Sequence, residues 1–370
     1  MFESNNIQEW GFAVCGETTK LAGQSLSTNL HWLRTASNYI SGVIPLEIGN
    51  LASLEVFDVR ENQLSGDIPA SVGKLAKLYQ LNLFSNSLSG CIPSSIGNPS
   101  DLSMLHASAN SLEGPIPPSI GKLSKLVGLE LSSNKPTSLI AKEIMDIATL
   151  SISLDLSNNM LEGPLPLEVG NLVNIERLYL SGNKLSGEIP DTIGNCRIME
   201  TLLMNNNSFQ GSIPATFKNM AGLTQLNLTD NNLNGSIPGT LASIPNLQEL
   251  YLARNNLSET IPEVLGNSTS LFRLDVSFNN LQAEVPKEGV FRNITGLSIA
   301  GNNALCGGIP QLHLPKCTKS TTEKEKKSMP KSLRTVIPIA GAIVLLLLGL
   351  ALAGFCYRKS KVGLKKDELP

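Results

Sequence analysis

One asparagine returns along this chain at an almost constant interval. The interval is 24 residues at every step except the one from Asn134 to Asn159, which is 25 residues. A fixed period of about 20 to 50 residues indicates an array of stacked units, so it constrains the fold more than composition does. The eleven positions are Asn38, Asn62, Asn86, Asn110, Asn134, Asn159, Asn183, Asn207, Asn231, Asn255 and Asn279.

Each asparagine stands in the same frame of apolar and turn residues. An apolar residue usually lies eight, five and three positions before it, and another follows at plus two. Gly is common at plus four and Ile-Pro at plus six and seven; ten of the eleven units keep this proline, and Ala141 replaces it in the other. The residues at minus five and minus three have the period of a strand. Frequent Pro and Gly argue against helical repeats, so the frame predicts a β-solenoid with a parallel sheet.

The polar and turn positions have predicted roles of their own. The asparagine amide can pair with backbone groups that would otherwise be buried unpaired, so a column of asparagines would link neighbouring coils. Gly permits positive φ where the chain leaves the strand, and Pro ends strand pairing. No single unit can bury its own apolar face, so we expect the array to be stable only as a stack.

The frame LxxLxxLxLxxNxLxGxIPxxIGN, seen in residues 75–98 and 220–243, resembles the plant-specific type of leucine-rich repeat. Residues 285–317 resemble the C-terminal cap of leucine-rich-repeat receptor-like kinases. They are most similar to the immune-receptor branch that includes the bacterial elongation-factor receptor and the rice bacterial-blight receptor. The resemblance implies an α/β-type solenoid, a right-handed curved superhelix with a parallel β-sheet on its concave face. It also implies a disulfide between Cys306 and Cys317.

A second hydrophobic feature lies near the C-terminus. Residues 336–357 contain no charge over 22 positions, which is long enough for a transmembrane helix across about 30 Å of hydrocarbon. Basic residues follow at once, as expected for a cytoplasmic flank, but the preceding segment is also lysine-rich. The family resemblance therefore decides the expected orientation, a single-pass plasma-membrane protein with its repeats outside.

The expected layout has six parts. They are a degraded repeat at 1–29, about eleven repeats at 30–290, a cap at 291–317, a flexible stalk at 318–335, the transmembrane helix at 336–357 and a short basic tail at 358–370. The first residues lack the basic start and apolar core of a signal peptide. No Gly-rich loop, HRD or DFG motif follows the apolar segment. We therefore interpret the chain as a truncated receptor without its kinase. A tail-anchored protein with cytosolic repeats is the alternative.

Composition argues against several other classes of protein. The chain has 29 basic and 31 acidic residues, so there is no basic excess for nucleic-acid binding. Only three histidines are present, which argues against a histidine-based catalytic or metal site. We expect no cofactor, no metal and no catalytic residue. Six Asn-x-Ser/Thr acceptors predict N-glycosylation in a luminal location, at Asn206, Asn227, Asn234, Asn256, Asn267 and Asn293.

The positions six, four and two before each asparagine point away from the core on the strand, so together they tile the concave face. Asn227 lies on this face and is itself a glycan acceptor, so the open stretch runs from Asp58 to Tyr179. Mixed charge with aromatic anchors suits an extended peptide, although exposed strand positions are polar in any solenoid. The predicted ligand-binding residues are Arg60, Phe84, His106, Glu130, Asp155, Arg177 and Tyr179.

Three functions fit these features. The first is a membrane-anchored receptor-like protein that recognises a peptide or protein ligand in plant defence and signals through a partner kinase or co-receptor. The second is a fragment of a complete Ser/Thr receptor kinase, whose enzymatic part would follow residue 370. The third is a non-signalling decoy or inhibitor-like protein, which the apolar segment at 336–357 disfavours. The first is the function that we predict.

Overall fold

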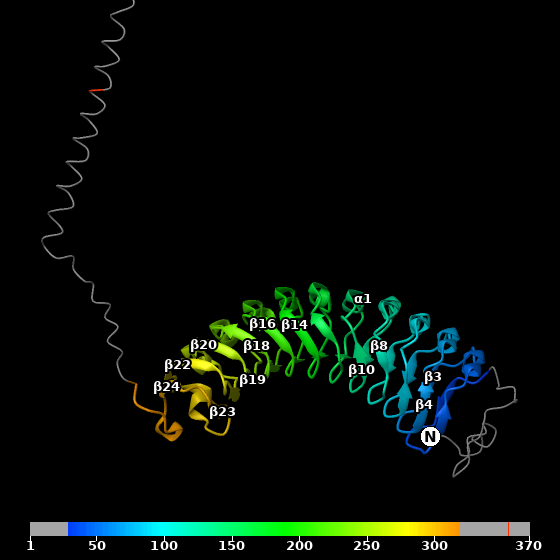
Figure 1. Cartoon of the computed structure of the whole chain (residues 1–370), viewed down its shortest axis with the longest axis horizontal. Coiled ribbons are helices and arrows are strands. Elements are labelled where there is room, and N and C mark those ends of the chain that lie inside the picture. The colour runs from blue at the N-terminus through cyan, green and yellow to red at the C-terminus, as the bar shows by residue number, and fades with distance from the viewer. Residues whose placement is uncertain (1–28, 318–353, 355–370) are drawn as a thin grey trace, which may run out of the picture. The chain divides into compact units, whose positions relative to one another are not determined.

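The computed structural model describes residues 29–317 and residue 354. Residues 29–317 lie within one continuous unit, an arch of stacked coils (Figure 1). The expected stalk, transmembrane helix and cytoplasmic tail fall outside the described residues, apart from Gly354, and so does the expected N-terminal repeat apart from Asn29. Among the residues that are described, no helix is long and apolar enough to span a membrane.

One parallel sheet runs through every coil of the arch. Its strands follow in sequence order and pair in register at the repeat interval, as Leu81 pairs with Leu105. This confirms the predicted parallel solenoid, and Figure 1 shows its helical segments along the outer rim. The strands are β1 (Trp32–Arg34), β3 (Val56–Asp58), β5 (Gln80–Asn82), β7 (Met104–His106), β9 (Gly128–Glu130), β11 (Ser153–Asp155), β13 (Arg177–Tyr179), β15 (Thr201–Leu203), β17 (Gln225–Asn227), β19 (Glu249–Tyr251), β21 (Arg273–Asp275) and β23 (Leu297–Ser298).

The last strand, β23, belongs to no predicted repeat. It pairs with β21 inside the segment expected to be the cap, so the sheet has 12 strands where the asparagine period predicts eleven. Asn302 continues the asparagine column there: its Nδ2 donates to Val276 O at 2.9 Å, and its Oδ1 accepts from Leu281 N at 3.0 Å. The cap therefore begins as one more coil.

The outer rim consists of short helical turns, almost all 3₁₀. Most follow the recurring proline, whose extended backbone (Pro69, φ −69°, ψ 138°) ends one strand and leads into the turn. Ala141 adopts nearly the same angles (φ −66°, ψ 129°) before the one α-helical turn within residues 29–317. The turns are η2 (Leu46–Asn50), η3 (Ala70–Lys74), η4 (Ser94–Gly97), η5 (Pro118–Lys122), α1 (Lys142–Met145), η6 (Leu167–Asn171), η7 (Asp191–Asn195), η8 (Ala215–Asn219), η9 (Gly239–Ser243), η10 (Glu263–Asn267), η11 (Gly289–Arg292) and η12 (Pro310–Leu312).

A second row of parallel strands lies between the concave sheet and the rim, and the sequence analysis did not predict it. The row is interrupted in two places. Between β6 and β8 only an isolated bridge, Cys91–Glu113, joins the coils, and β10 does not pair with β12, in the coil with the extra residue. Its strands are β2 (Ser41–Val43), β4 (Gln63–Asp67), β6 (Ser87–Ser89), β8 (Glu113–Pro115), β10 (Lys135–Thr137), β12 (Glu162–Pro164), β14 (Lys184–Glu188), β16 (Ser208–Gly211), β18 (Asn232–Gly235), β20 (Asn256–Thr260), β22 (Asn280–Val285) and β24 (Ala304–Gly307).

Leucine and isoleucine side chains from every coil merge into one continuous core. The apolar positions of the frame are almost fully buried, as Leu102, Leu105 and Leu112 illustrate at 0 to 1% exposure. Each coil contributes only one layer of this core, so its apolar face is covered by the coils on either side. At about 25 cal/mol per Å² of apolar surface, this shared burial is the main source of stability for a stack.

The recurring asparagines join neighbouring coils as predicted. The Nδ2 group of Asn110 donates to Leu83 O in the preceding coil at 2.9 Å and to Ala107 O in its own coil at 3.2 Å. Its Oδ1 accepts the N–H of Leu88 at 2.9 Å. One side chain thus pairs backbone groups of two coils at the turn, where neither sheet can pair them.

Candidate functional site

Two columns of side chains cross the concave sheet. The in-register pairing places residues minus four from each asparagine on adjacent strands, so His106 lies beside Glu130, Glu130 beside Asp155, and Asp155 beside Tyr179. The minus-six column runs parallel to it and places Ser153 beside Arg177. Adjacent strands are about 4.8 Å apart, so these side chains can interact directly.

We call His106, Glu130, Ser153, Asp155, Arg177 and Tyr179 the central cluster. Glu130 joins its first members: Oε1 accepts from Ser153 Oγ at 3.1 Å, and Oε2 lies 3.8 Å from His106 Nε2. His106 Nε2 is itself buried without a hydrogen-bond partner among the described residues. Because this nitrogen is closed to solvent, the polar atoms that the cluster offers to a ligand are those of its other side chains.

Burial and neighbouring charges shift the pKa of Tyr179. Burial raises the pKa of its hydroxyl, the neighbouring Arg177 guanidinium lowers it, and the carboxylates of Asp155 and Glu130 raise it further. The net direction is upward, so the hydroxyl stays protonated at physiological pH and can act as a hydrogen-bond donor.

Arg60 and Phe84 lie just beyond the ends of β3 and β5, at the minus-two position. Both are exposed, Phe84 over 38% of its surface. Arg60 Nη1 lies 3.5 Å from Asp58 Oδ2. No hydrogen bond or ion pair joins either residue to the central cluster within residues 29–317. The structure therefore brings five of the seven predicted residues together and leaves Arg60 and Phe84 as separate positions on the same face.

The expectation that the whole minus-four column is open to solvent is wrong at two positions. Asp58 and Asn82 are only 5% and 3% exposed. Their short side chains turn back to the N–H two residues on, and Asn82 Oδ1 accepts from Phe84 N at 3.2 Å. Asp155 does the same through Oδ1, which accepts from Ser157 N at 2.9 Å and from Ser157 Oγ at 2.6 Å. Short Asp and Asn side chains favour this local bond, so they offer less to a ligand than Glu130 does.

A second polar network lies further along the same columns, and the sequence analysis discounted it. Glu249 Oε2 accepts from Gln225 Nε2 at 2.9 Å and from the Tyr251 hydroxyl at 3.1 Å, while Arg273 Nη1 lies 3.3 Å from Glu249 Oε1. The column positions alone could have identified it. It lies outside the predicted stretch because Asn227, half-buried here, is a glycan acceptor on the neighbouring strand.

The cap disulfide is present. Cys306 and Cys317 are bonded, with their Cα atoms 5.0 Å apart, which confirms the pairing implied by the resemblance. Cys196 is a fully buried free thiol in the core, and Cys91 is an exposed one. Five glycan acceptors, Asn206, Asn234, Asn256, Asn267 and Asn293, are exposed in the described part of the chain. Within that part, no group of three or more His, Cys, Asp or Glu side chains could hold a metal ion.

Comparison with known sequences identifies the repeat. Two leucine-rich-repeat family profiles match residues 173–257 in two overlapping segments and residues 53–75, 77–99 and 152–172. The repeats are leucine-rich repeats. A receptor-like protein kinase of Arabidopsis thaliana is 42% identical over 77 residues, which is 21% of this chain and 7% of that protein. The receptor kinase-like protein Xa21 of Oryza sativa subsp. japonica is 43% identical over 56 residues, 15% of this chain and 5% of that protein.

Solved structures agree with these leucine-rich-repeat matches. The plant peptide hormone receptor RGFR1, in complex with RGF2, superposes with a TM-score of 0.68 at 34% identity, covering 74% of this chain and 43% of that one. A TDR receptor gives 0.64 at 29% identity over 76% of this chain and 52% of that one. A plant ice-binding protein gives 0.56 at 26% identity over 78% and 84%. The leucine-rich repeats of this chain are therefore homologous to those of plant receptor-like kinases, and the chain spans only part of the receptors that it matches.

Proposed function

We propose that this chain is the recognition part of a plant membrane receptor and that it binds an extended peptide across the concave sheet. The observation that carries the proposal is the central cluster, in which charged and aromatic side chains from consecutive strands form one surface. Peptide binding by the neighbour RGFR1, in complex with RGF2, supports the same kind of ligand. The plant ice-binding neighbour has a similar fold, so the argument rests on these side chains rather than on the fold.

The cluster suggests how a peptide would be held. The strands are spaced about 4.8 Å apart, so a peptide running across them reaches the side chains of a new strand about every one to two residues. Glu130 and Arg177 supply opposite charges two strands apart, and Tyr179 supplies a hydroxyl and a ring. A ligand with a basic residue over Glu130 and an acidic one over Arg177 would complement both.

Membrane anchoring, the defence role and signalling are parts of the same proposal. Residues 336–357 would span the plasma membrane with the repeats outside, and a partner kinase or co-receptor would carry the signal. A second candidate is the N-terminal part of a longer Ser/Thr receptor kinase. The observation that favours it is that both curated relatives are receptor kinases of which the match spans 7% and 5%. Sequencing the transcript beyond residue 370 distinguishes the two, because a kinase would add HRD and DFG motifs.

Ligand binding can be tested with the full chain purified in detergent. A synthetic library of plant secreted peptides is screened by biolayer interferometry, and each binder is measured again on the Glu130→Lys and Arg177→Glu variants. We expect at least a tenfold loss of affinity, equivalent to about 1.4 kcal/mol. Glu162→Lys is the matched control, because Glu162 is exposed on β12 of the same coil as Asp155. Equal affinity in all variants would refute the proposed surface.

Topology is tested separately. In microsomes from cells that express the tagged chain, protected repeats together with a glycosidase-sensitive mobility shift would support an extracellular orientation. Repeats that are digested outside intact vesicles, with no mobility shift, would support the cytosolic alternative and refute this part of the proposal.

A further inference from the structure

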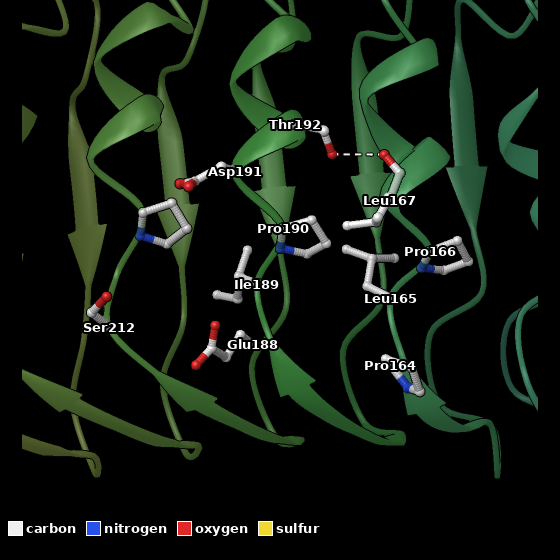
Figure 2. A pocket seen from close by; sticks show the side chains of 11 residues that line it. Pro164, Leu165, Pro166, Leu167, Glu188, Ile189, Pro190, Asp191, Thr192 and Ser212 are labelled. Atoms are coloured by element: carbon white, nitrogen blue, oxygen red, sulfur yellow. Dashed lines mark hydrogen bonds between the residues drawn. The ribbon is translucent and has the colours of Figure 1, made fainter.

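A groove lies far from the concave columns, where the second row of strands meets the outer rim (Figure 2). It encloses about 520 Å³ and crosses the coils that contain β12, β14 and β16. Its lining residues come from the ends of β12 and β14, the starts of η6 and η7, and the segments that lead from the second row of strands into η6, η7 and η8. They are Pro164, Leu165, Pro166, Leu167, Glu188, Ile189, Pro190, Asp191, Thr192, Ser212 and Pro214.

The floor and one wall of the groove are apolar. Leu165 and Ile189 form the floor at 2% and 4% exposure, and the ring of Pro190 lies beside them. Leu167 forms the wall and exposes 68% of its surface, although its backbone is held in place by Thr192 Oγ1, which donates to Leu167 O at 2.6 Å. A leucine so exposed on an ordered turn offers apolar area to a partner at little cost in chain ordering.

Two carboxylates complete the lining. Glu188 and Asp191 are exposed, and Figure 2 shows both on the side of Pro190 that faces the coil of Ser212. The Glu188 side chain lies over Gly211 of the next coil, where the absence of a side chain leaves room for it. A Cβ on Gly211 would lie 2.9 Å from Glu188 Cγ. Asp191 Oδ1 accepts one long hydrogen bond from Thr216 Oγ1, at 3.5 Å.

No cation within residues 29–317 neutralises these two groups. Some exposed acids of the same solenoid do have partners, such as Asp101 with Lys125 and Glu284 with Lys287. The groove is therefore an apolar trough with two carboxylates and no basic side chain in its lining. Its charge disfavours acidic polysaccharides and matches a cation attached to an apolar stem.

We propose that this groove is a second binding site, separate from the concave face, for a basic extended segment of a protein partner. An arginine or lysine of that segment places its aliphatic stem against Leu167 and Pro190 and its cation between Glu188 and Asp191. A proline or aliphatic neighbour covers Ile189. Lysine and arginine commonly combine an apolar stem contact with a charged head contact in this way.

The test uses the full chain in detergent and a phage-displayed library of random heptapeptides. The library is selected on the native chain after depletion on the Glu188→Gln/Asp191→Asn double variant. We expect the enriched peptides to contain arginine or lysine next to proline or an aliphatic residue. Their synthetic versions should lose at least tenfold in affinity on the double variant and also on Leu167→Ser.

Matched controls occupy the same frame positions in other coils. Asp67 corresponds to Glu188 and Glu263 to Asp191, both are exposed, and neither lies in the groove. The Asp67→Asn/Glu263→Gln variant should bind the selected peptides like the native chain. The proposal is overturned if no enriched peptide depends on Glu188 and Asp191, if binders lack basic residues, or if polygalacturonate binds the groove instead. Glu130→Lys should leave groove binding unchanged, so this result is independent of the concave-face proposal.

Discussion

Replacing Asn231 by alanine is the most direct test of the asparagine column, because the structure shows which backbone groups would lose a hydrogen-bond partner. Asn231 is 8% exposed, and its Nδ2 donates to Met204 O, Leu228 O and Thr229 O at 3.1 to 3.3 Å. Its Oδ1 accepts the N–H of Phe209, a residue with 0% exposure, at 3.0 Å.

The three carbonyls and the single N–H differ in what they lose. Met204 O keeps the bond from Asn207 Nδ2 at 3.2 Å, and Leu228 O keeps the bond from Asn255 Nδ2 at 2.9 Å. Thr229 O keeps the N–H of Asn206 at 2.9 Å. The Phe209 N–H loses the acceptor given by Asn231. An unpaired buried group costs about 1–3 kcal/mol, and weakening the carbonyl bonds adds about 1 kcal/mol. We therefore expect the Asn231→Ala variant to lose about 2–4 kcal/mol of unfolding free energy.

Asn38 is the matched control, because it holds the same frame position in the first coil. It is exposed, and its Nδ2 donates to Thr35 O and Ala36 O at 3.0 and 2.9 Å within its own coil. Asn38→Ala should cost less than about 1 kcal/mol. Guanidinium unfolding followed by circular dichroism measures both variants, and hydrogen exchange reports the Phe209 amide. Equal midpoints for the two variants, or unchanged protection of Phe209, would refute the reasoning.

Three further predictions follow from the same structure. Removing the cap disulfide by Cys306→Ser/Cys317→Ser opens a loop with a sequence separation of 11 and should cost about 3 kcal/mol, seen as earlier proteolysis of the cap; unchanged proteolysis would contradict it. Gly97→Ala should lower the melting temperature, because its Cβ would lie 2.1 Å from a carbonyl oxygen of the next coil; an unchanged melting temperature would show that the coils separate easily. Burial raises the pKa of the Cys196 thiol from 9.0 to about 12, so the unfolded chain loses this proton first and stability should fall between those pH values. A Cys196→Ala variant that shows the same pH dependence would argue against this cause.

Much of the arrangement could be predicted from spacing alone. The 24-residue interval, the paired apolar positions and the recurring Pro and Gly predicted the parallel sheet, the asparagine links and the positive φ at plus four. Gly66 has φ +72°, and Glu259 adopts φ +69° at the same frame position without being glycine. The frame therefore imposes the backbone even where the residue does not favour it.

The second row of strands was missed because its signal is weak in sequence. Most of these strands include or directly follow a single apolar residue at plus two, and in most coils Gly and Pro follow within five positions of it. Such a segment has no strand propensity of its own, and it pairs because the neighbouring coil presents the same backbone at the same height. The interruptions after β6 and β10 likewise depend on pairing between coils.

On the concave surface, too, one part could be predicted from the sequence and another depends on the tertiary structure. The period determined which residues occupy its columns, since the direction of a side chain on a strand follows from its position in the frame. Only the tertiary structure decided which of them remain available: Asp58 and Asn82 are almost fully covered, while Glu130 reaches His106 and Ser153 on the two flanking strands. The groove at Pro190 likewise needs three coils side by side. Backbone geometry is local and repeats with the sequence, whereas burial and charge pairing depend on contacts between residues about 24 positions apart, which only stacking brings together.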